Sequence, residues 1–171
     1  MEKKEILNVL TESLAMEEKG HKFYKEGAEK IKNSLGRRML TRLADDELVH
    51  IKRIKDIYNH LMDETTSQLE LPTDKIEHFD KIFGRMQENL KEAVEDLTEV
   101  GVDDEEIINV ALELESHAKF YYQEAAEKAS EPKVKEFYQR LAQEEQNHYE
   151  LLRKTHTYLE NPSLFYGMGY H

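Results

Sequence analysis

The chain has 171 residues, 35% of them charged, and a formal net charge of −12 at pH 7. This length suits a single domain over residues 1–171, and the acidic excess argues against a nucleic-acid surface, which needs a basic face. The lack of cysteine excludes disulfides, Cys-ligated zinc, iron–sulfur clusters and thiol nucleophiles. No signal peptide and no run of about 20 apolar residues is visible, so we expect a cytoplasmic protein without a membrane partner.

Two amphipathic helices are predicted in the first third of the chain, over about residues 2–32 and 35–61. The inward stripe of the first helix consists of Leu10, Leu14, Glu17, His21, Tyr24, Ala28 and Ile31. That of the second helix consists of Leu40, Leu43, Glu47, His50, Ile54, Ile57 and Leu61. Because the turn between the helices is short, they must be antiparallel neighbours.

A long crossover is predicted over residues 62–102. Its first part is rich in Thr, Ser, Pro and acidic residues and is expected to be irregular. An amphipathic pattern returns at about 74–97 and predicts an extra helix without an inward carboxylate. We expect the apolar side of this helix to cover the bundle or a partner subunit.

Two further helices are predicted after the crossover. The third runs to about Ala129 with Asp103 as its N-cap, and the fourth runs to about Glu160, with Ser130 as its cap and Pro132 in its first turn. Their inward stripes contain Ile108, Ala111, Leu112, Glu115, Tyr122 and Ala126, followed by Val134, Tyr138, Leu141, Glu145, His148 and Leu152. The aromatic tail over 161–171 is too short to fold alone.

Residues of about 10–61 recur at 108–159 with a constant offset of 98 positions and no gap. Each half contains a lone glutamate and, 30 residues later, a Glu-x-x-His whose two side chains share a helix face. The matched pairs are Glu17 and Glu115, Tyr24 and Tyr122, Glu47 and Glu145, and His50 and His148. The constant offset makes these pairs more informative than the unrepeated Glu18-x-x-His21.

The repeat therefore places four glutamates and two histidines midway along four apolar stripes. Burying several carboxylates costs many kcal/mol unless cations pair with them, and no Lys or Arg occupies these stripes. Two divalent cations would neutralise four carboxylates, and two neutral imidazoles would complete a di-iron or di-manganese carboxylate site. The alternative is a metal-free buried network in a helical adaptor protein.

The sequence resembles the rubrerythrin branch of the ferritin-like superfamily over four of its five predicted helices. The resemblance implies an all-α, ferritin-like antiparallel four-helix bundle that holds two iron ions, with manganese as the alternative. It implies that Glu47 and Glu145 bridge the metals, that Glu17 and Glu115 are terminal ligands, and that His50 and His148 each bind one metal. Tyr24 and Tyr122 would hydrogen-bond ligand carboxylates; ordinary core packing is the alternative for both.

The chain also departs from typical rubrerythrins at two points. It lacks the four-cysteine rubredoxin domain, and Leu112 stands where they carry an additional glutamate. The repeat partner of His21 is Lys119, so we interpret His21 as a rim residue, and His60, His78, His117 and His156 as solvated.

The function implied is that of a non-haem diiron oxidoreductase that reduces hydrogen peroxide or dioxygen. Without cysteine, electrons must come from an external donor such as a rubredoxin or a flavoprotein. The alternatives are iron oxidation and release, as in ferritin relatives, and peroxide disproportionation by manganese. We expect a homo-oligomer, a dimer.

Overall fold

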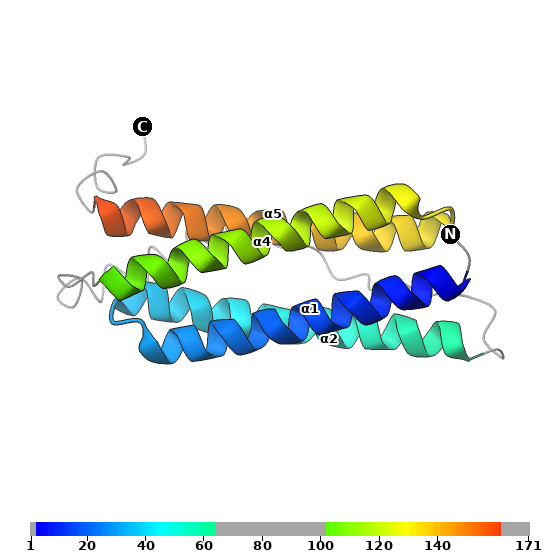
Figure 1. Cartoon of the computed structure of the whole chain (residues 1–171), viewed down its shortest axis with the longest axis horizontal. Coiled ribbons are helices and arrows are strands. Elements are labelled where there is room, and N and C mark those ends of the chain that lie inside the picture. The colour runs from blue at the N-terminus through cyan, green and yellow to red at the C-terminus, as the bar shows by residue number, and fades with distance from the viewer. Residues whose placement is uncertain (1–2, 64–101, 162–171) are drawn as a thin grey trace, which may run out of the picture.

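The computed structural model describes residues 3–63 and 102–161, and these residues form four long helices. Helix α1 (Lys3–Lys30) and α2 (Ser34–Met62) make one antiparallel hairpin, and α4 (Val102–Lys128) and α5 (Pro132–Glu160) make a second. The two hairpins lie side by side with their helix axes nearly aligned (Figure 1). The predicted all-α four-helix bundle is therefore confirmed. The predicted extra helix at 74–97 lies outside the described residues, as do most of the crossover and the tail.

The turn between α1 and α2 is held by two buried polar side chains. Asn33 is the N-cap of α2, and its Oδ1 accepts hydrogen bonds from the backbone N–H groups of Leu35 and Gly36. Asp104 on α4 accepts hydrogen bonds at 2.9 Å from the backbone N–H groups of Lys32 and Asn33. The start of the second hairpin is thereby fastened to the turn of the first.

Two predicted caps are wrong. Helix α4 begins at Val102, so Asp103 is already the second helical residue, within the first turn where acidic residues are favoured. The N-cap of α5 is Glu131 rather than Ser130, with Pro132 opening the helix as predicted. At the start of α5 the reason is steric. The ring of a proline disfavours helical backbone in the preceding residue, and Glu131 has φ −83° and ψ 124°.

The apolar core consists of two clusters separated by a polar layer. One cluster contains Tyr24, Leu35, Leu43, Ile108 and Leu152, and the other contains Leu10, Ile54, Tyr122, Tyr138 and Leu141. Each fully buried Leu or Ile stabilises the fold by about 1.5–3 kcal/mol. Burial of the two clusters therefore offsets the free-energy cost of burying the polar layer. Within the described ranges, no helix combines the length and hydropathy that crossing a membrane requires.

Candidate metal centre

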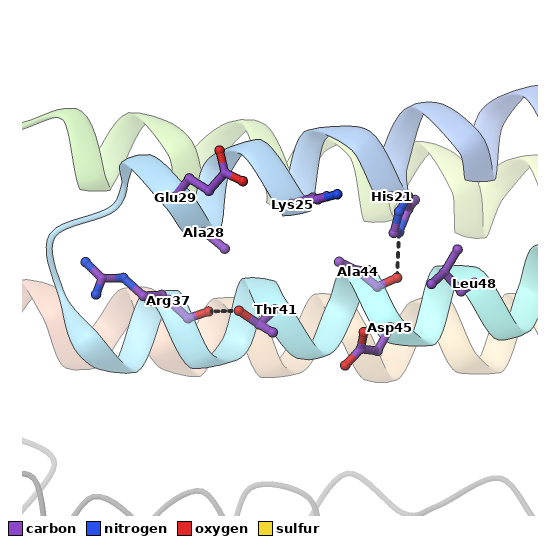
Figure 2. A pocket seen from close by; sticks show the side chains of 9 residues that line it. All are labelled: His21, Lys25, Ala28, Glu29, Arg37, Thr41, Ala44, Asp45 and Leu48. Atoms are coloured by element: carbon purple, nitrogen blue, oxygen red, sulfur yellow. Dashed lines mark hydrogen bonds between the residues drawn. The ribbon is translucent and has the colours of Figure 1, made fainter.

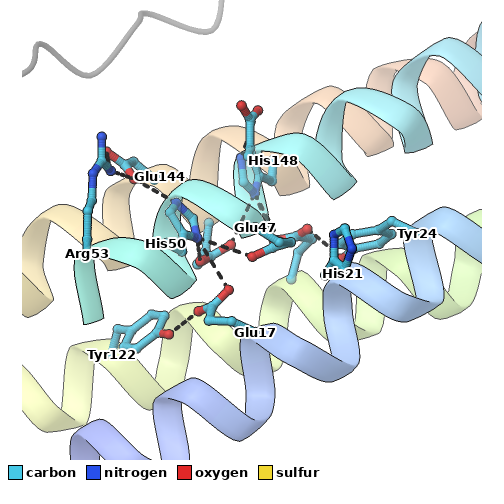
Figure 3. A network of polar contacts seen from close by, with 12 residues as sticks. Glu17, His21, Tyr24, Glu47, His50, Arg53, Tyr122, Glu144 and His148 are labelled. Carbon is cyan, nitrogen blue, oxygen red and sulfur yellow. Dashed lines mark hydrogen bonds and ion pairs between the residues drawn. The ribbon is translucent and has the colours of Figure 1, made fainter. Parts of the chain in front are cut away.

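The structure brings all six predicted site residues together in the polar layer. Glu17 comes from α1, Glu47 and His50 from α2, Glu115 from α4, and Glu145 and His148 from α5. Each side chain lies near the middle of its helix, and none is more than 6% exposed. Figure 3 shows several of them converging between the hairpins. Water therefore cannot solvate the carboxylates, and their charge must be balanced inside the protein.

The six residues divide into two overlapping groups of four. One group consists of Glu17, Glu47, His50 and Glu145, and the other of Glu47, Glu115, Glu145 and His148. Within each group, one ligand atom from every residue lies within 4.8 Å of the others. Glu47 and Glu145 belong to both groups. This is the arrangement that two cations sharing two carboxylates would require.

Each of the two histidines faces more carboxylate acceptors than its Nδ1–H can donate to. The Nδ1 atom of His50 lies 3.4 Å from Glu17, 3.2 Å from Glu47 and 3.1 Å from Glu145. On the other side, Nδ1 of His148 lies 3.2 Å from Glu145, 3.5 Å from Glu115 and 3.8 Å from Glu47. One N–H cannot satisfy three carboxylates, whereas a cation between the nitrogen and the oxygens would interact with all of them.

The shared carboxylates also have unsatisfied atoms. Among the described residues, Glu47 Oε2 and Glu145 Oε1 are buried without a hydrogen bond, although His50 Nδ1 lies 3.2 Å from the first and 3.1 Å from the second. A single Nδ1–H can satisfy at most one of these oxygens, and a buried carboxylate oxygen without a hydrogen bond is costly, which indicates that something other than protein completes the site. The donor set of carboxylate oxygens and imidazole nitrogens suits iron, manganese or zinc. The residues present therefore fit a pair of divalent metal ions.

Protonation has to balance the charge when no cation is bound. Burial raises the pKa of Glu115 to about 8, and burial together with Glu17 and Glu145 raises that of Glu47 well above its usual value. Burial alone would lower the pKa of His50, but Glu145 and further carboxylates raise it well above its usual value. Protons thus occupy the place that metal ions would take.

Charge is distributed unevenly over the two shared glutamates. Burial acts to raise the pKa of Glu145, but His50 and His148 together hold it well below its usual range. Burial likewise opposes protonation of His148, and Glu115 heads the carboxylates that raise its pKa. Glu145 is therefore the carboxylate that stays ionised, between two protonated imidazoles.

A carboxylate stands behind each histidine, and these two residues were not predicted. His50 Nε2 lies 2.7 Å from Glu144 Oε2, and Arg53 also donates to Glu144 at 2.7 and 3.0 Å (Figure 3). His148 Nε2 lies 3.5 Å from Asp46 Oδ2. Against the effect of burial, the histidines lower the pKa of both carboxyl groups. Each carboxylate thereby holds a proton on Nε2 and leaves Nδ1 facing the cluster.

The sequence contained a signal for this pair. Asp46 and Glu144 each precede a shared glutamate by one position, and they too are separated by 98 residues. Neither belongs to an apolar stripe, so the helical periodicity does not mark them as inward positions. Both are partly exposed and contact a histidine of the neighbouring hairpin.

Tyr24 and Tyr122 connect the two hairpins. The Tyr24 hydroxyl on α1 donates to Glu115 Oε1 on α4 at 2.6 Å, and the Tyr122 hydroxyl on α4 donates to Glu17 Oε1 on α1. Burial raises the pKa of both phenols well above the usual value, so both remain donors. These bonds occupy Oε1 and leave Oε2 of each glutamate toward the histidines.

His21 lies at the edge of the site. Its Nδ1 lies 2.8 Å from the backbone carbonyl oxygen of Ala44, and because a carbonyl only accepts, Nδ1 donates this bond (Figure 2). The ring lines a groove between α1 and α2 together with Lys25 and Leu48. His21 belongs to neither group of candidate ligands among the described residues. Its position agrees with the predicted rim residue.

His156 is less solvated than predicted. Its side chain is 19% exposed and lies 3.5 Å from Glu160 and 4.0 Å from Glu105. This contact could not be predicted from sequence spacing, because Glu105 lies in the first turn of α4 whereas His156 and Glu160 lie at the end of α5. Among the described residues these three form the remaining His–Glu group, at the bundle end and away from the centre.

An antiparallel four-helix bundle with Glu-x-x-His on one helix of each hairpin and a lone inward glutamate on the other defines a ferritin-like protein. The family model described as Rubrerythrin matches residues 8–100 and 106–164. The chain thus belongs to the rubrerythrin family.

A solved structure supports the fold independently. A hypothetical protein from Pyrococcus furiosus is similar in structure, with a TM-score of 0.64 and 23% sequence identity, over 91% of this chain and 90% of the other. None of the curated proteins compared with the chain matches it.

Proposed function

We propose that the protein is a diiron oxidoreductase that reduces hydrogen peroxide or dioxygen with electrons from an external donor. The observation that supports this most is the pair of buried four-residue groups that share Glu47 and Glu145. Two iron ions, when bound, would supply the two electrons that the oxidant takes up. Glu17 and His50 would complete one metal position, and Glu115 and His148 the other.

The surrounding residues prepare the six ligands for this role. Glu144 and Asp46 hold the Nε2 protons of the histidines, so that each Nδ1 presents its lone pair to a metal. The tyrosine hydroxyls fix Glu17 and Glu115 through Oε1. The apolar clusters on both sides exclude water, which strengthens the electrostatic interactions within the layer.

Iron oxidation followed by release is the second candidate, and Leu112 favours it. Leu112 packs against the apolar cluster that contains Tyr24, one turn before Glu115. No additional carboxylate therefore stands at this position to follow a change in metal charge. A centre with fewer negative ligands holds oxidised iron less strongly.

Peroxide consumption by the anaerobic, iron-loaded and reduced protein separates these functions. The proposal predicts that consumption stops after about one equivalent per centre and resumes when an external donor is added. Glu145→Ala should abolish the reaction, whereas Glu113→Ala, at an exposed position of α4, should retain it. Iron release after a single oxidation would support iron handling, and continued consumption without donor would indicate a manganese-type disproportionation.

The electron donor and the oligomeric state of the protein also belong to the proposed function. The lack of cysteine in the chain means that a rubredoxin or a flavoprotein would have to deliver the electrons. The homodimer predicted from the sequence can be checked by light scattering on the purified protein.

A further inference from the structure

Three tyrosine rings extend from one candidate ligand into the second hairpin. Tyr122, whose hydroxyl donates to Glu17, lies edge-on to Tyr121 with ring centroids 5.8 Å apart. It also stacks on Tyr138, with centroids 6.2 Å apart and an interplanar angle of 17°. The cluster thus connects the candidate centre to the half-buried Tyr121 near the surface.

The tyrosines differ in where their protons can go. The Tyr121 hydroxyl donates to the exposed Glu12 carboxylate at 2.8 Å. The Tyr138 hydroxyl is buried and has no hydrogen-bond partner among the described residues. A phenol that loses an electron also loses its hydroxyl proton, so a nearby carboxylate makes oxidation easier. Tyr121 has such an acceptor and Tyr138 lacks one.

The other hairpin repeats the edge-on ring contact but has neither the phenol hydroxyl nor its carboxylate acceptor. At the 98-residue offset, Phe23 corresponds to Tyr121, and it lies edge-on to Tyr24 with centroids 5.6 Å apart. Val110 corresponds to Glu12, so phenol and proton acceptor are replaced together. Packing alone would be satisfied by phenylalanine, as at Phe23. The Tyr121–Glu12 pair therefore calls for a separate explanation.

We infer that Tyr121 is a one-electron donor to the centre, which rests on the proposed function. Reduction of one hydrogen peroxide to two waters consumes two electrons and two protons. A centre that holds one ferrous and one ferric ion would supply only one of these electrons, and Tyr121 would supply the second through the Tyr122 ring. The Tyr121 hydroxyl proton passes to Glu12 Oε2, leaving a neutral phenoxyl radical, while the two protons for water come from solvent. A surface one-electron reductant of the thiol or ascorbate class restores Tyr121, and Glu12 returns the proton.

Radical trapping tests the inference by a readout other than turnover. The iron-loaded protein, poised with one ferrous and one ferric ion per centre, is treated with excess hydrogen peroxide and a nitroso spin trap, and the adduct is located by peptide mass spectrometry. Absorbance reports oxidation of the centre in the same sample. We expect an adduct on Tyr121 that is lost in Tyr121→Phe, diminished in Glu12→Gln and retained in Tyr138→Phe.

A transplanted pair provides the gain-of-function control. Phe23→Tyr combined with Val110→Glu should produce a second adduct at position 23, whereas Phe23→Tyr alone should produce less. An equal Tyr121 adduct in metal-free protein would overturn the inference, as would oxidation of the half-reduced centre, which has one electron to give, without any adduct on Tyr121. If peroxide does not oxidise the centre, the proposed function fails. An oxidised centre without the adduct contradicts the inference alone, so the two failures are distinguishable.

Discussion

Glu17 and Glu115 lie in equivalent surroundings although they come from different halves of the chain. Each accepts a hydrogen bond from a tyrosine of the opposite hairpin, and each has Oε2 close to a histidine Nδ1. The rings of His50 and His148 stack with centroids 5.6 Å apart. What the two halves share is the set of residues that a pair of metal ions needs.

The carboxylates that contact the Nε2 atoms of the two histidines differ more in distance and exposure. Glu144 lies 2.7 Å from His50, is 12% exposed and is held by Arg53. Asp46 lies 3.5 Å from His148, is 32% exposed and pairs with Arg42 at 3.4 Å. A shorter and more buried contact orients its histidine more firmly. The difference indicates that the His50 position is the stronger of the two metal positions.

The largest expected effect is on stability, at the layer where both halves meet. Metal that binds only the folded protein stabilises it by about 4 kcal/mol per position at a metal concentration roughly 1,000 times Kd. Thermal unfolding of metal-free and iron- or manganese-loaded protein should therefore show a much higher Tm for the loaded form. Equal Tm values at saturating metal would contradict a buried metal site.

This difference should also depend on pH. The pKa of Glu115 is raised from 4.5 to about 8, so the proton that stabilises the metal-free fold is fully bound below pH 4.5 and lost as pH rises through about 8. The raised pKa values of Glu47, His50 and His148 act in the same direction. Because metal competes with these protons, the gap in Tm should widen between pH 5 and 8.

Glu115→Gln removes one of these groups and should flatten the pH dependence of the metal-free protein. Glu113→Gln, at an exposed position of the same helix, is the matched control and should leave the slope unchanged. A slope that persists in Glu115→Gln would show that the pH dependence arises elsewhere.

The histidines provide the next test, because each belongs to only one group of candidate ligands. His50→Ala and His148→Ala should each lower the metal content by about one ion per chain. His117→Ala, at an exposed position of α4, should lower it by none. Titration followed by elemental analysis measures this. Loss of all metal from both variants would mean that the halves do not form separable positions.

The smallest effect concerns the carboxylates behind the histidines. Asp46→Asn and Glu144→Gln should each weaken metal binding about 10–100-fold, with the larger loss in Glu144→Gln. Asp45→Asn removes the same charge at an exposed neighbouring position and should change affinity little. Isothermal titration with Mn²⁺ would compare the three variants. A reversed order of Asp46→Asn and Glu144→Gln would contradict the proposed inequality of the two supports.

Much of the centre could be predicted because a helix converts sequence spacing into position. Glu47 and His50 share a face at i and i+3, and a constant offset means that the second hairpin repeats the geometry of the first. The four helices and the convergence of six polar residues follow from these two regularities.

Contacts between hairpins could not be read in the same way. Glu144 is shielded where His50 and Arg53 of α2 contact it, and Glu105 meets His156 because two distant helix ends lie together. Neither contact has a period along the chain. Ser130 was wrongly predicted as the N-cap in place of Glu131 for a local reason instead, the effect of Pro132 on the residue before it.

The most direct test of the central claim is the metal content of protein purified without added metal and then loaded with Fe²⁺ under anaerobic conditions. Two ions per chain are expected for the wild type. Glu47→Ala and Glu145→Ala should each lose both ions, because each removes a carboxylate that belongs to both groups. An unchanged metal content in either variant, or a wild-type protein that binds no metal, would contradict a centre built on two shared carboxylates.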